Sequence, residues 1–254
     1  MVKPKKHLGQ HFLTDPNIAE KIVLGLGDDD LKVLEIGPGT GVLTQYLIEK
    51  YKKDLYAIEI DSESYLYLQN KYPSLGDRLL NKDFLKINLK DYFDSEFSII
   101  GNFPYNISSQ IFFKVLENKD IVKNVVCMIQ KEVANRIRSN HGNKTYGILS
   151  VFLQAYYDID LLFNVKPGVF NPPPKVDSSV IRLRRNDRNK LDCDEKLFFR
   201  IVKTGFNQRR KTLRNSLKSI ISDIGIDEEI FKKRPEQLSV DEFVELTNIV
   251  EYRM

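Results

Sequence analysis

Short apolar runs alternate with amphipathic segments along the first two thirds of the chain. The runs are compact and end near a glycine or an acid, as buried strands do, whereas the segments between them have helical spacing. The expected strands are 31–36, 55–60, 79–83, 97–100 and 125–129. The expected helices are 15–26, 41–52, 62–71, 131–139 and 147–156. This alternation predicts an α/β fold with a parallel, doubly wound sheet.

The pattern changes twice in the last third of the chain. Runs at 158–165 and 179–183 predict an antiparallel pair that closes the sheet, and from about residue 187 the pattern is wholly helical. We therefore expect a Rossmann-like α/β domain over residues 1–186 and a small all-α domain over residues 187–254.

Composition narrows the class of protein. The chain has 254 residues, of which 42% are hydrophobic and 29% charged, and this balance excludes a disordered or fibrous chain. No apolar run approaches the ~20 residues of a membrane helix, and no apolar stretch follows the basic N-terminal residues. The two cysteines are far apart and there are only three histidines, so we expect reduced thiols, no metal site and a cytoplasmic location.

Basic side chains are grouped rather than scattered. The net charge is only +4, yet no acid occurs between Lys196 and Lys218. Such single-sign stretches favour a polyanionic partner such as RNA or DNA, although a solvated helix face gives the same pattern. The side chains expected to contact RNA are Arg209, Arg210, Lys211, Arg214 and Lys218.

A glycine-rich turn follows the first expected strand. The sequence Glu-Ile-Gly-Pro-Gly-Thr-Gly, residues 35–41, joins that strand to a helix, so backbone N–H groups can approach a ligand there. Acids end the next two strands at Glu59 and Asp83, where carboxylates can accept hydrogen bonds from ribose hydroxyls and from an adenine amine. Together these features predict a site for S-adenosylmethionine (SAM).

The fourth expected strand ends in Gly-Asn-Phe-Pro-Tyr, residues 101–105. An exocyclic amine is a poor nucleophile because its lone pair is delocalised into the base. The Asn102 side-chain oxygen and the carbonyl of Phe103 or Pro104 can orient such an amine, and the Tyr105 ring can stack on the base. The stiff Pro-rich segment at 170–178 supplies Phe170 as a possible opposite wall. These side chains predict methyl transfer to a base amine by positioning rather than by a strong base.

At this point the chain resembles the rRNA adenine N6,N6-dimethyltransferases, over about residue 6 to beyond residue 220. The motifs that carry the resemblance are His-Leu-Gly-Gln-His-Phe-Leu at 7–13, Leu-Glu-Ile-Gly-Pro-Gly at 34–39, Asn-Phe-Pro-Tyr-Asn-Ile-Ser at 102–108, and the segments 130–136, 170–178 and 206–217. The last is similar to the bacterial small-subunit branch. The resemblance implies SAM-dependent dimethylation of two adjacent adenines in the 3′-terminal hairpin of small-subunit rRNA, late in subunit assembly. We expect the protein to be a monomer.

The resemblance also implies residue roles. Those implied to contact SAM are His11, Leu13, Gly37, Glu59, Asp83 and Asn102. Asn102, Pro104 and Tyr105 are implied to hold the target adenine, with Phe170 stacked on it. Two positions depart from the family pattern: His11 stands where many members have Asn, and Phe103 where Leu is usual. We expect Phe103 to pack inward, so that its change leaves the chemistry unaffected.

For RNA binding we expect residues 208–218 to form one helix that carries Arg210 and Arg214 at i and i+4. Other functions remain open. They are the large-subunit branch associated with macrolide resistance, an assembly factor whose binding outweighs its chemistry, and a nicotinamide-dependent dehydrogenase. The Gly-x-Gly-x-Gly turn and the lack of a histidine suited to hydride relay argue against the last.

Overall fold

The computed structural model describes residues 2–27, 30–221 and 228–254. The chain forms two compact units, one of residues up to 134 with 159–185, and one of 135–158 with 186–254. The boundary near residue 186 stays a prediction, and the stretch 135–158 joins the second unit although it precedes that boundary. Helix α6 (Ile148–Gln154) accounts for this, because Phe152 packs edge-on against Phe199 of α7 (Glu195–Asn207) at 4.4 Å between ring centroids.

The first unit contains the expected sheet. Its strands run in the spatial order β4-β3-β2-β5-β6-β9-β7, and the first five are mutually parallel. Strand β9 is antiparallel to β6. Chain order reverses beside β2, which has β3 on one side and β5 on the other. The bounds are β2 Lys32–Ile36, β3 Leu55–Ile58, β4 Leu79–Leu80, β5 Phe97–Asn102, β6 Val122–Gln130, β7 Tyr157–Val165 and β9 Ser178–Arg185.

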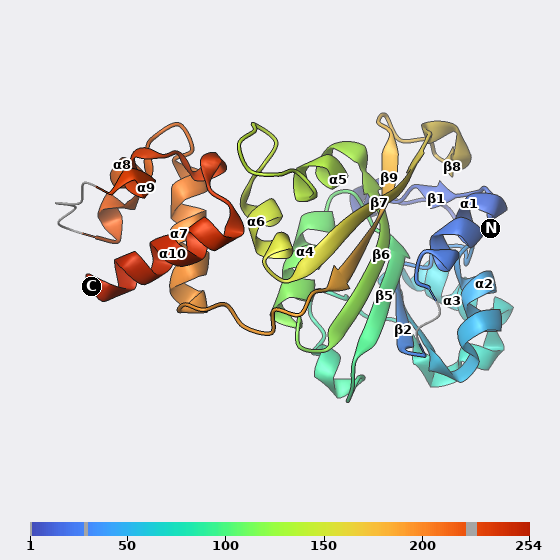
Figure 1. Cartoon of the computed structure of the whole chain (residues 1–254). Coiled ribbons are helices and arrows are strands. Elements are labelled where there is room, and N and C mark those ends of the chain that lie inside the picture. Colours follow the sequence, from blue (N-terminus) through green and yellow to red (C-terminus); the bar gives the residue numbers. More distant parts are fainter. Residues whose placement is uncertain (1, 28–29, 222–227) are drawn as a thin grey trace. The chain divides into compact units, whose positions relative to one another are not determined.

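Helices cover both faces of this sheet. Helices α1 (Pro16–Leu24), α2 (Thr44–Tyr51) and α3 (Ser62–Lys71) lie on one side and α4 (Ser108–Glu117) on the other (Figure 1). Helix α1 begins where the sequence predicts, because the Asp15 carboxylate accepts hydrogen bonds from the N–H groups of Asn17 (2.9 Å) and Ile18 (3.2 Å). The central strands are buried on both faces, which explains why they are continuous apolar runs rather than alternating ones.

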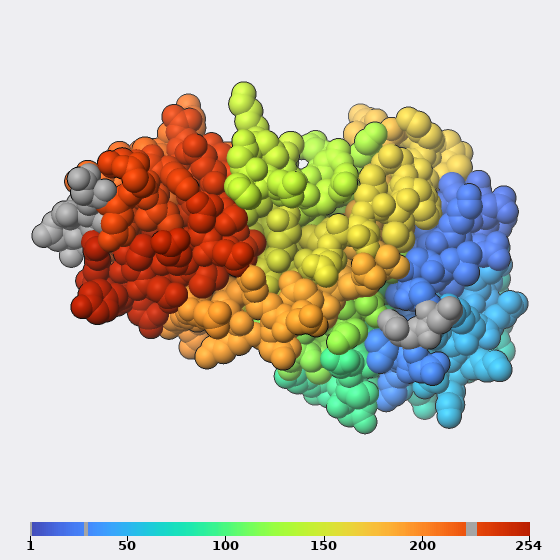
Figure 2. Space-filling model, viewed as in Figure 1, coloured from blue at the N-terminus to red at the C-terminus, as the bar shows by residue number. Residues whose placement is uncertain are grey.

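A small second sheet joins the N-terminal segment to the middle of the chain. Strand β1 (Phe12–Leu13) pairs antiparallel with β8 (Phe170–Asn171), so Leu13 lies opposite Phe170. In the space-filling view the blue N-terminal residues lie directly against the yellow residues around 170 (Figure 2). Sequence reasoning missed this pairing because strands of two residues are too short to give a periodic pattern.

The second unit is helical, as expected. Its core is aromatic and includes Phe152, Phe198 and Phe243. Besides α6 and α7 it contains α8 (Leu213–Ser216), α9 (Glu229–Lys232) and α10 (Val240–Tyr252), while α5 (Lys131–Ile137) runs across the division between the units. Among the residues that the structure describes, the 3-10 helices are Lys6–Leu8, Lys52–Asp54, Pro73–Arg78, Leu89–Asp91, Pro167–Val169, Leu217–Ser219 and Pro235–Gln237. In the part of the chain that the structure covers, every helix is too short or too polar to cross a membrane.

The single helix expected over 208–218 is wrong. Helix α7 ends at Asn207, a turn follows, and α8 begins only at Leu213. If α7 continued beyond Asn207, the residues four and seven positions after buried Gly205, which are Arg209 and Thr212, would lie on its buried face. The turn interrupts the helix, and α8 begins with a different rotation, so that Leu213 and Leu217 are buried instead. Arg210 and Arg214 therefore do not share a helix face.

Candidate functional site

A cavity of about 290 Å³ lies at the carboxyl edge of the sheet, where chain order reverses between β2 and β5. Doubly wound sheets bind ligands at this switch point. The loops after β2, β3, β4 and β5 form its floor and sides, and residues 7–12 form the remaining wall. We call residues 5–13 the N-terminal strap. The predicted order of the strands brings the four loops to one edge of the sheet. The strap is a fifth element of the cavity, and the strand pattern does not predict its position there.

The turn after β2 exposes backbone to the cavity. Gly37 and Gly39 have φ values of +66° and +58°, which side-chain-bearing residues rarely adopt. A Cβ on Gly39 would lie 2.7 Å from the Phe12 ring of the strap, so a side chain there would push the strap outward. A Cβ on Gly37 meets nothing within 4 Å, so a ligand can approach the main chain at this point.

Glu59 lies beside this turn, just beyond β3, and is only 3% exposed. Its Oε2 accepts a hydrogen bond from the Gly39 N–H (3.0 Å) and its Oε1 accepts one from the Asp61 N–H (2.9 Å). Burial raises the pKa of the Glu59 carboxyl, and these N–H donors partly offset that effect. Each carboxylate oxygen keeps a lone pair, so both remain able to accept a ribose hydroxyl.

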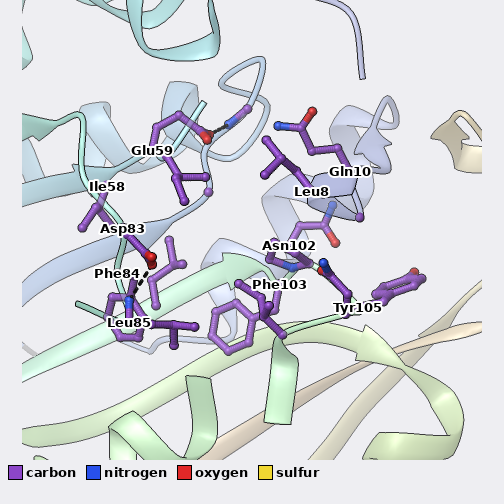
Figure 3. Close-up of a pocket in the computed structure, with 18 of the residues that line it drawn as sticks. Leu8, Gln10, Ile58, Glu59, Asp83, Phe84, Leu85, Asn102, Phe103 and Tyr105 are labelled. Carbon is purple, nitrogen blue, oxygen red and sulfur yellow. Dashed lines mark hydrogen bonds between the residues drawn. The ribbon is translucent and has the colours of Figure 1, made fainter. Parts of the chain in front are cut away.

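Asp83 is on the same side of the cavity as Glu59, after β4 (Figure 3). Its Oδ1 accepts a hydrogen bond from the Leu85 N–H at 3.0 Å, which fixes the carboxylate at the cavity rim. Apolar side chains complete this side, among them Ile58, Ile60 and Phe84. Two fixed carboxylates beside an apolar slot fit the ribose and adenine of SAM. The volume is close to the lower end of the range of about 300–1,000 Å³ for small-molecule sites.

A second buried acid lies behind the glycine turn. Glu35 of β2 is 1% exposed, and its Oε2 accepts a hydrogen bond from the Thr44 hydroxyl at 2.7 Å, which ties β2 to the first turn of α2. Burial raises the pKa of Glu35 to about 8, against an ordinary value of 4.5; the hydrogen bond from Thr44 acts to lower it, and the charge of Glu59 acts to raise it further. Glu35 is outside the residues that line the cavity.

The strap is anchored at Asp61, the N-cap of α3. The Asp61 carboxylate accepts a hydrogen bond from Lys5 Nζ and is 3.5 Å from Gln10 Nε2. Burial acts to raise the pKa of Asp61, but the hydrogen bonds from Lys5, the Glu63 N–H and Ser64 outweigh it and lower the pKa. The same residue donates its N–H to Glu59. Asp61 thus joins the strap to the side of the cavity that carries Glu59.

Asn102 ends β5 on the opposite side, and its orientation is determined by a neighbour. Its Nδ2 donates a hydrogen bond to the His11 backbone carbonyl at 2.8 Å. A carbonyl can only accept, so the amide nitrogen faces the strap and Oδ1 is left to accept a hydrogen bond. The chain immediately after it is also fixed, because the Phe103 N–H donates to the Met128 carbonyl (3.1 Å) and the Ile107 N–H to the Pro104 carbonyl (3.2 Å).

The structure brings together most of the residues predicted for the site. Those that line the cavity are His11, Gly37, Glu59, Asp83, Asn102, Pro104 and Tyr105. Figure 3 shows Tyr105 directed away from Glu59 and Asp83. Phe103 packs inward as expected, edge-on to Phe112 of α4.

Leu13 and Phe170 are not brought to the cavity wall. Both side chains are buried in the hydrophobic core, opposite each other in the β1–β8 ladder. Their contacts with SAM and with the target base stay predictions. The sequence pattern also gave no indication of Leu8, Gln10 and Phe84, which line the cavity. The motif at 7–13 marked the strap, but nothing in its pattern showed which of its side chains face inward.

In the second unit, four of the basic residues predicted to contact RNA are exposed. They are Arg210, Lys211, Arg214 and Lys218. Arg209 is half-buried, and its guanidinium donates a hydrogen bond to the Asn143 carbonyl (3.2 Å) and lies 3.7 Å from the Glu236 carboxylate. Its observed contacts are therefore structural. Among the residues with described positions, no group of His, Cys, Asp and Glu has an arrangement that could hold a metal ion.

Comparisons with known proteins agree with this geometry. The family model for ribosomal RNA adenine dimethylase matches residues 1–250. A protein of Cytophaga hutchinsonii named ribosomal RNA small subunit methyltransferase A is 57% identical over 252 residues, which cover 98% of each chain.

Two solved structures are also similar. A dimethyladenosine transferase from Plasmodium falciparum has a TM-score of 0.80 and 26% identity, over 96% of this chain and 98% of that one. The 23S rRNA methyltransferase ErmE has a TM-score of 0.68 and 25% identity, over 93% and 99%. The chain therefore belongs to the ribosomal RNA adenine dimethylase family, SAM-dependent enzymes that dimethylate N6 of adenine in ribosomal RNA.

Proposed function

We propose that this chain dimethylates N6 of two adjacent adenines in the 3′-terminal hairpin of small-subunit rRNA, late in subunit assembly. The observation that carries the proposal is the orientation of Asn102, whose amide nitrogen is occupied by His11 and whose Oδ1 is left as an acceptor beside the acid-lined cavity. The choice of the small subunit is supported by the name of the 57% identical, full-length relative.

The residues of the β5 loop supply the positioning that the reaction needs. Bound SAM supplies an electrophilic methyl group. Asn102 Oδ1 accepts a hydrogen bond from one N6–H of the adenine, and the carbonyl of Phe103 or Pro104 accepts one from the other; the Pro104 carbonyl keeps a lone pair beside its bond from the Ile107 N–H. Two such hydrogen bonds favour a tetrahedral amine with its lone pair aimed along one direction. Tyr105 provides the aromatic face for the base, and alignment rather than proton removal accelerates transfer.

The first test is transfer of labelled methyl from SAM to undermethylated small subunits, with large-subunit RNA in parallel. We expect label in the small subunit alone, recovered as N6,N6-dimethyladenosine after digestion. Label in large-subunit RNA would assign the chain to the branch that ErmE represents. Tight binding to small subunits without label would favour an assembly factor. We further propose a cytoplasmic location and action as a monomer; sedimentation of the purified protein with and without small subunits measures its oligomeric state.

RNA contact by the second unit is a separate part of the proposal. The exposed cations of the turn and of α8 are suited to phosphate contacts, which position an enzyme without reading sequence. We expect affinity for small subunits to fall steeply with salt, and Arg210→Ala to reduce the slope of log K against log salt by about 1. Lys53→Ala is the matched control, because Lys53 is exposed just before β3, at the opposite edge of the sheet from the cavity. If the two variants gave equal slopes of log K against log salt, Arg210 would make no phosphate contact.

A further inference from the structure

The Tyr105 ring is held by Ser178, the last residue of the 170–178 segment, for which the sequence predicted no role. Its hydroxyl shares a hydrogen bond of 2.5 Å with the hydroxyl of Ser178. Ser178 is fully buried and begins β9, where it pairs with Gln130 at the end of β6. The far end of the Tyr105 side chain is therefore attached to the sheet itself, although Tyr105 belongs to a loop.

His11 supports the same ring from the strap. The His11 and Tyr105 rings are stacked, with centroids 5.4 Å apart and planes inclined by 29°. The His11 ring is fixed in turn, because its Nδ1 lies 2.7 Å from the Pro172 carbonyl and must be the donor in that bond. The His11 backbone carbonyl meanwhile accepts from Asn102. One residue thus contacts both Asn102 and Tyr105.

We propose that Ser178 and His11 are positioning residues for methyl transfer, which hold Tyr105 and Asn102 in the alignment that the target adenine requires. The proposal rests on the function proposed above, in which Asn102 and Tyr105 bind that adenine. It assigns the His11 side chain to the adenine side of the cavity rather than to SAM. It also gives a role to the departure at position 11, since the Asn usual there has no ring to stack on Tyr105.

The first experiment separates turnover from cofactor affinity. We expect Ser178→Ala and Tyr105→Phe each to lower kcat about three- to tenfold, the effect of one lost hydrogen bond, with the Kd for SAM within about twofold of the parent. The double variant should be no worse than the poorer single variant, because both remove the same bond. Additive losses, or a matching loss of SAM affinity, would overturn the role of Ser178.

Ser179→Ala is the matched control for Ser178→Ala. Ser179 is the next residue of β9, is equally buried, and donates its hydroxyl to Asn164 Oδ1 of β7 at 2.8 Å, away from the β5 loop. The control should leave kcat unchanged although it also removes a buried hydrogen bond. If both variants lost turnover equally, the effect would come from general weakening of β9 and the proposal would fail.

His11→Asn tests the contact that the strap makes with the Tyr105 ring. The substitution keeps the backbone carbonyl for Asn102 but removes the ring from Tyr105. We expect a severalfold lower kcat at saturating SAM and an unchanged Kd for SAM. The opposite result, weaker SAM binding with kcat retained at saturation, would make His11 a cofactor ligand and overturn its positioning role.

A measurement that needs no substrate tests the contacts of Ser178 and His11 with Tyr105 even if the proposed function is wrong. The chain has 12 tyrosines, so 3-fluorotyrosine labelling gives a set of 19F resonances in which Tyr105 is identified by its loss in Tyr105→Phe. Ser178→Ala and His11→Asn should shift that resonance, and Ser179→Ala should not. An unchanged Tyr105 resonance in both variants would refute the proposal that Ser178 and His11 hold this ring. Absence of methyl transfer by the parent enzyme would instead refute the function.

Discussion

Two sides of the cavity are held in place by different kinds of contact: the side that we propose binds SAM, here the cofactor side, and the side that we propose binds the target adenine, here the adenine side. On the cofactor side, backbone N–H groups fix Glu59 and Asp83, from residues 2 or 20 positions away in the chain. On the adenine side, Asn102 and Tyr105 are held by partners 91 and 73 positions away. The contacts of one side come from strand-end turns, whereas those of the other depend on the assembled fold.

This difference implies that the two sides can be perturbed separately. We expect changes on the cofactor side to alter the affinity for SAM while leaving the β5 loop in place. We expect changes on the adenine side to alter alignment, and therefore turnover, while leaving the carboxylates in place. Asp61 is the exception, because it bonds to both the strap and the Glu59 carboxylate.

The largest effect is expected for Asn102→Ala. Loss of Oδ1 removes an acceptor for the target amine, and loss of Nδ2 releases the strap at His11. We expect kcat to fall roughly 100- to 1,000-fold, the usual result of deleting one preorganised polar group at a reacting centre. The Kd for SAM, from calorimetry, should change far less. Equal losses of turnover and affinity would make Asn102 a cofactor residue only and would remove the distinction between the two sides.

A smaller effect, on the affinity for SAM rather than on kcat, is expected for Glu59→Gln. The amide keeps the shape of the side chain but turns one acceptor into a donor that faces the N–H of Gly39 or Asp61. We expect the Kd for SAM to rise about tenfold or more, since a buried polar group is left unpaired, with kcat at saturating SAM nearly unchanged. Glu49→Gln, on the exposed part of α2, serves as the control. A fall in kcat at saturation would show that Glu59 also aligns the reaction.

The third effect concerns the stability of the fold rather than SAM affinity or turnover, and it arises behind the cofactor side. Burial raises the pKa of Glu35 to about 8, so between roughly pH 5 and pH 8 the folded chain holds a proton that the unfolded chain releases. The free energy of unfolding should therefore fall as pH rises through this window, by at most about 1.4 kcal/mol per pH unit from this group.

Glu35→Gln keeps an acceptor for the Thr44 hydroxyl and removes the titration. Urea unfolding at several pH values should give a shallower decline for the variant than for the parent. Parallel curves would contradict the raised pKa. The Kd for SAM of the variant should match the parent at pH 7, because Glu35 is not among the cavity residues.

What could be predicted from the sequence follows the same division. The strands, the turn at Gly37 and the acids at Glu59 and Asp83 were predictable because each is encoded by neighbouring residues: a buried apolar run, then a glycine or an acid at the carboxyl edge. The order of parallel strands then places them together. These elements are confirmed by the sheet order and by the residues that line the cavity.

The contacts that hold the adenine side were not predictable in this way. Ser178 is an ordinary polar residue at a strand start, and only the pairing of β9 with β6 brings it to Tyr105. The break at residues 208–212 was missed for a related reason. The local sequence is compatible with a helix, but the tertiary core requires Leu213 and Leu217 at a different phase from α7.

The β1–β8 ladder has a consequence for how the enzyme is made. Strap and partner are far apart in the order of synthesis, since His11 and Pro172 are 161 residues apart. At a translation rate of about 5–20 residues per second, the strap leaves the ribosome roughly 8–30 s before the segment that it pairs with exists. The strap emerges first but waits longest for its full set of contacts, because its partners at Asp61 and Asn102 are made well before the β8 segment. Nascent chains arrested before residue 170 should retain SAM poorly, although every strand that bears a cofactor carboxylate is already complete.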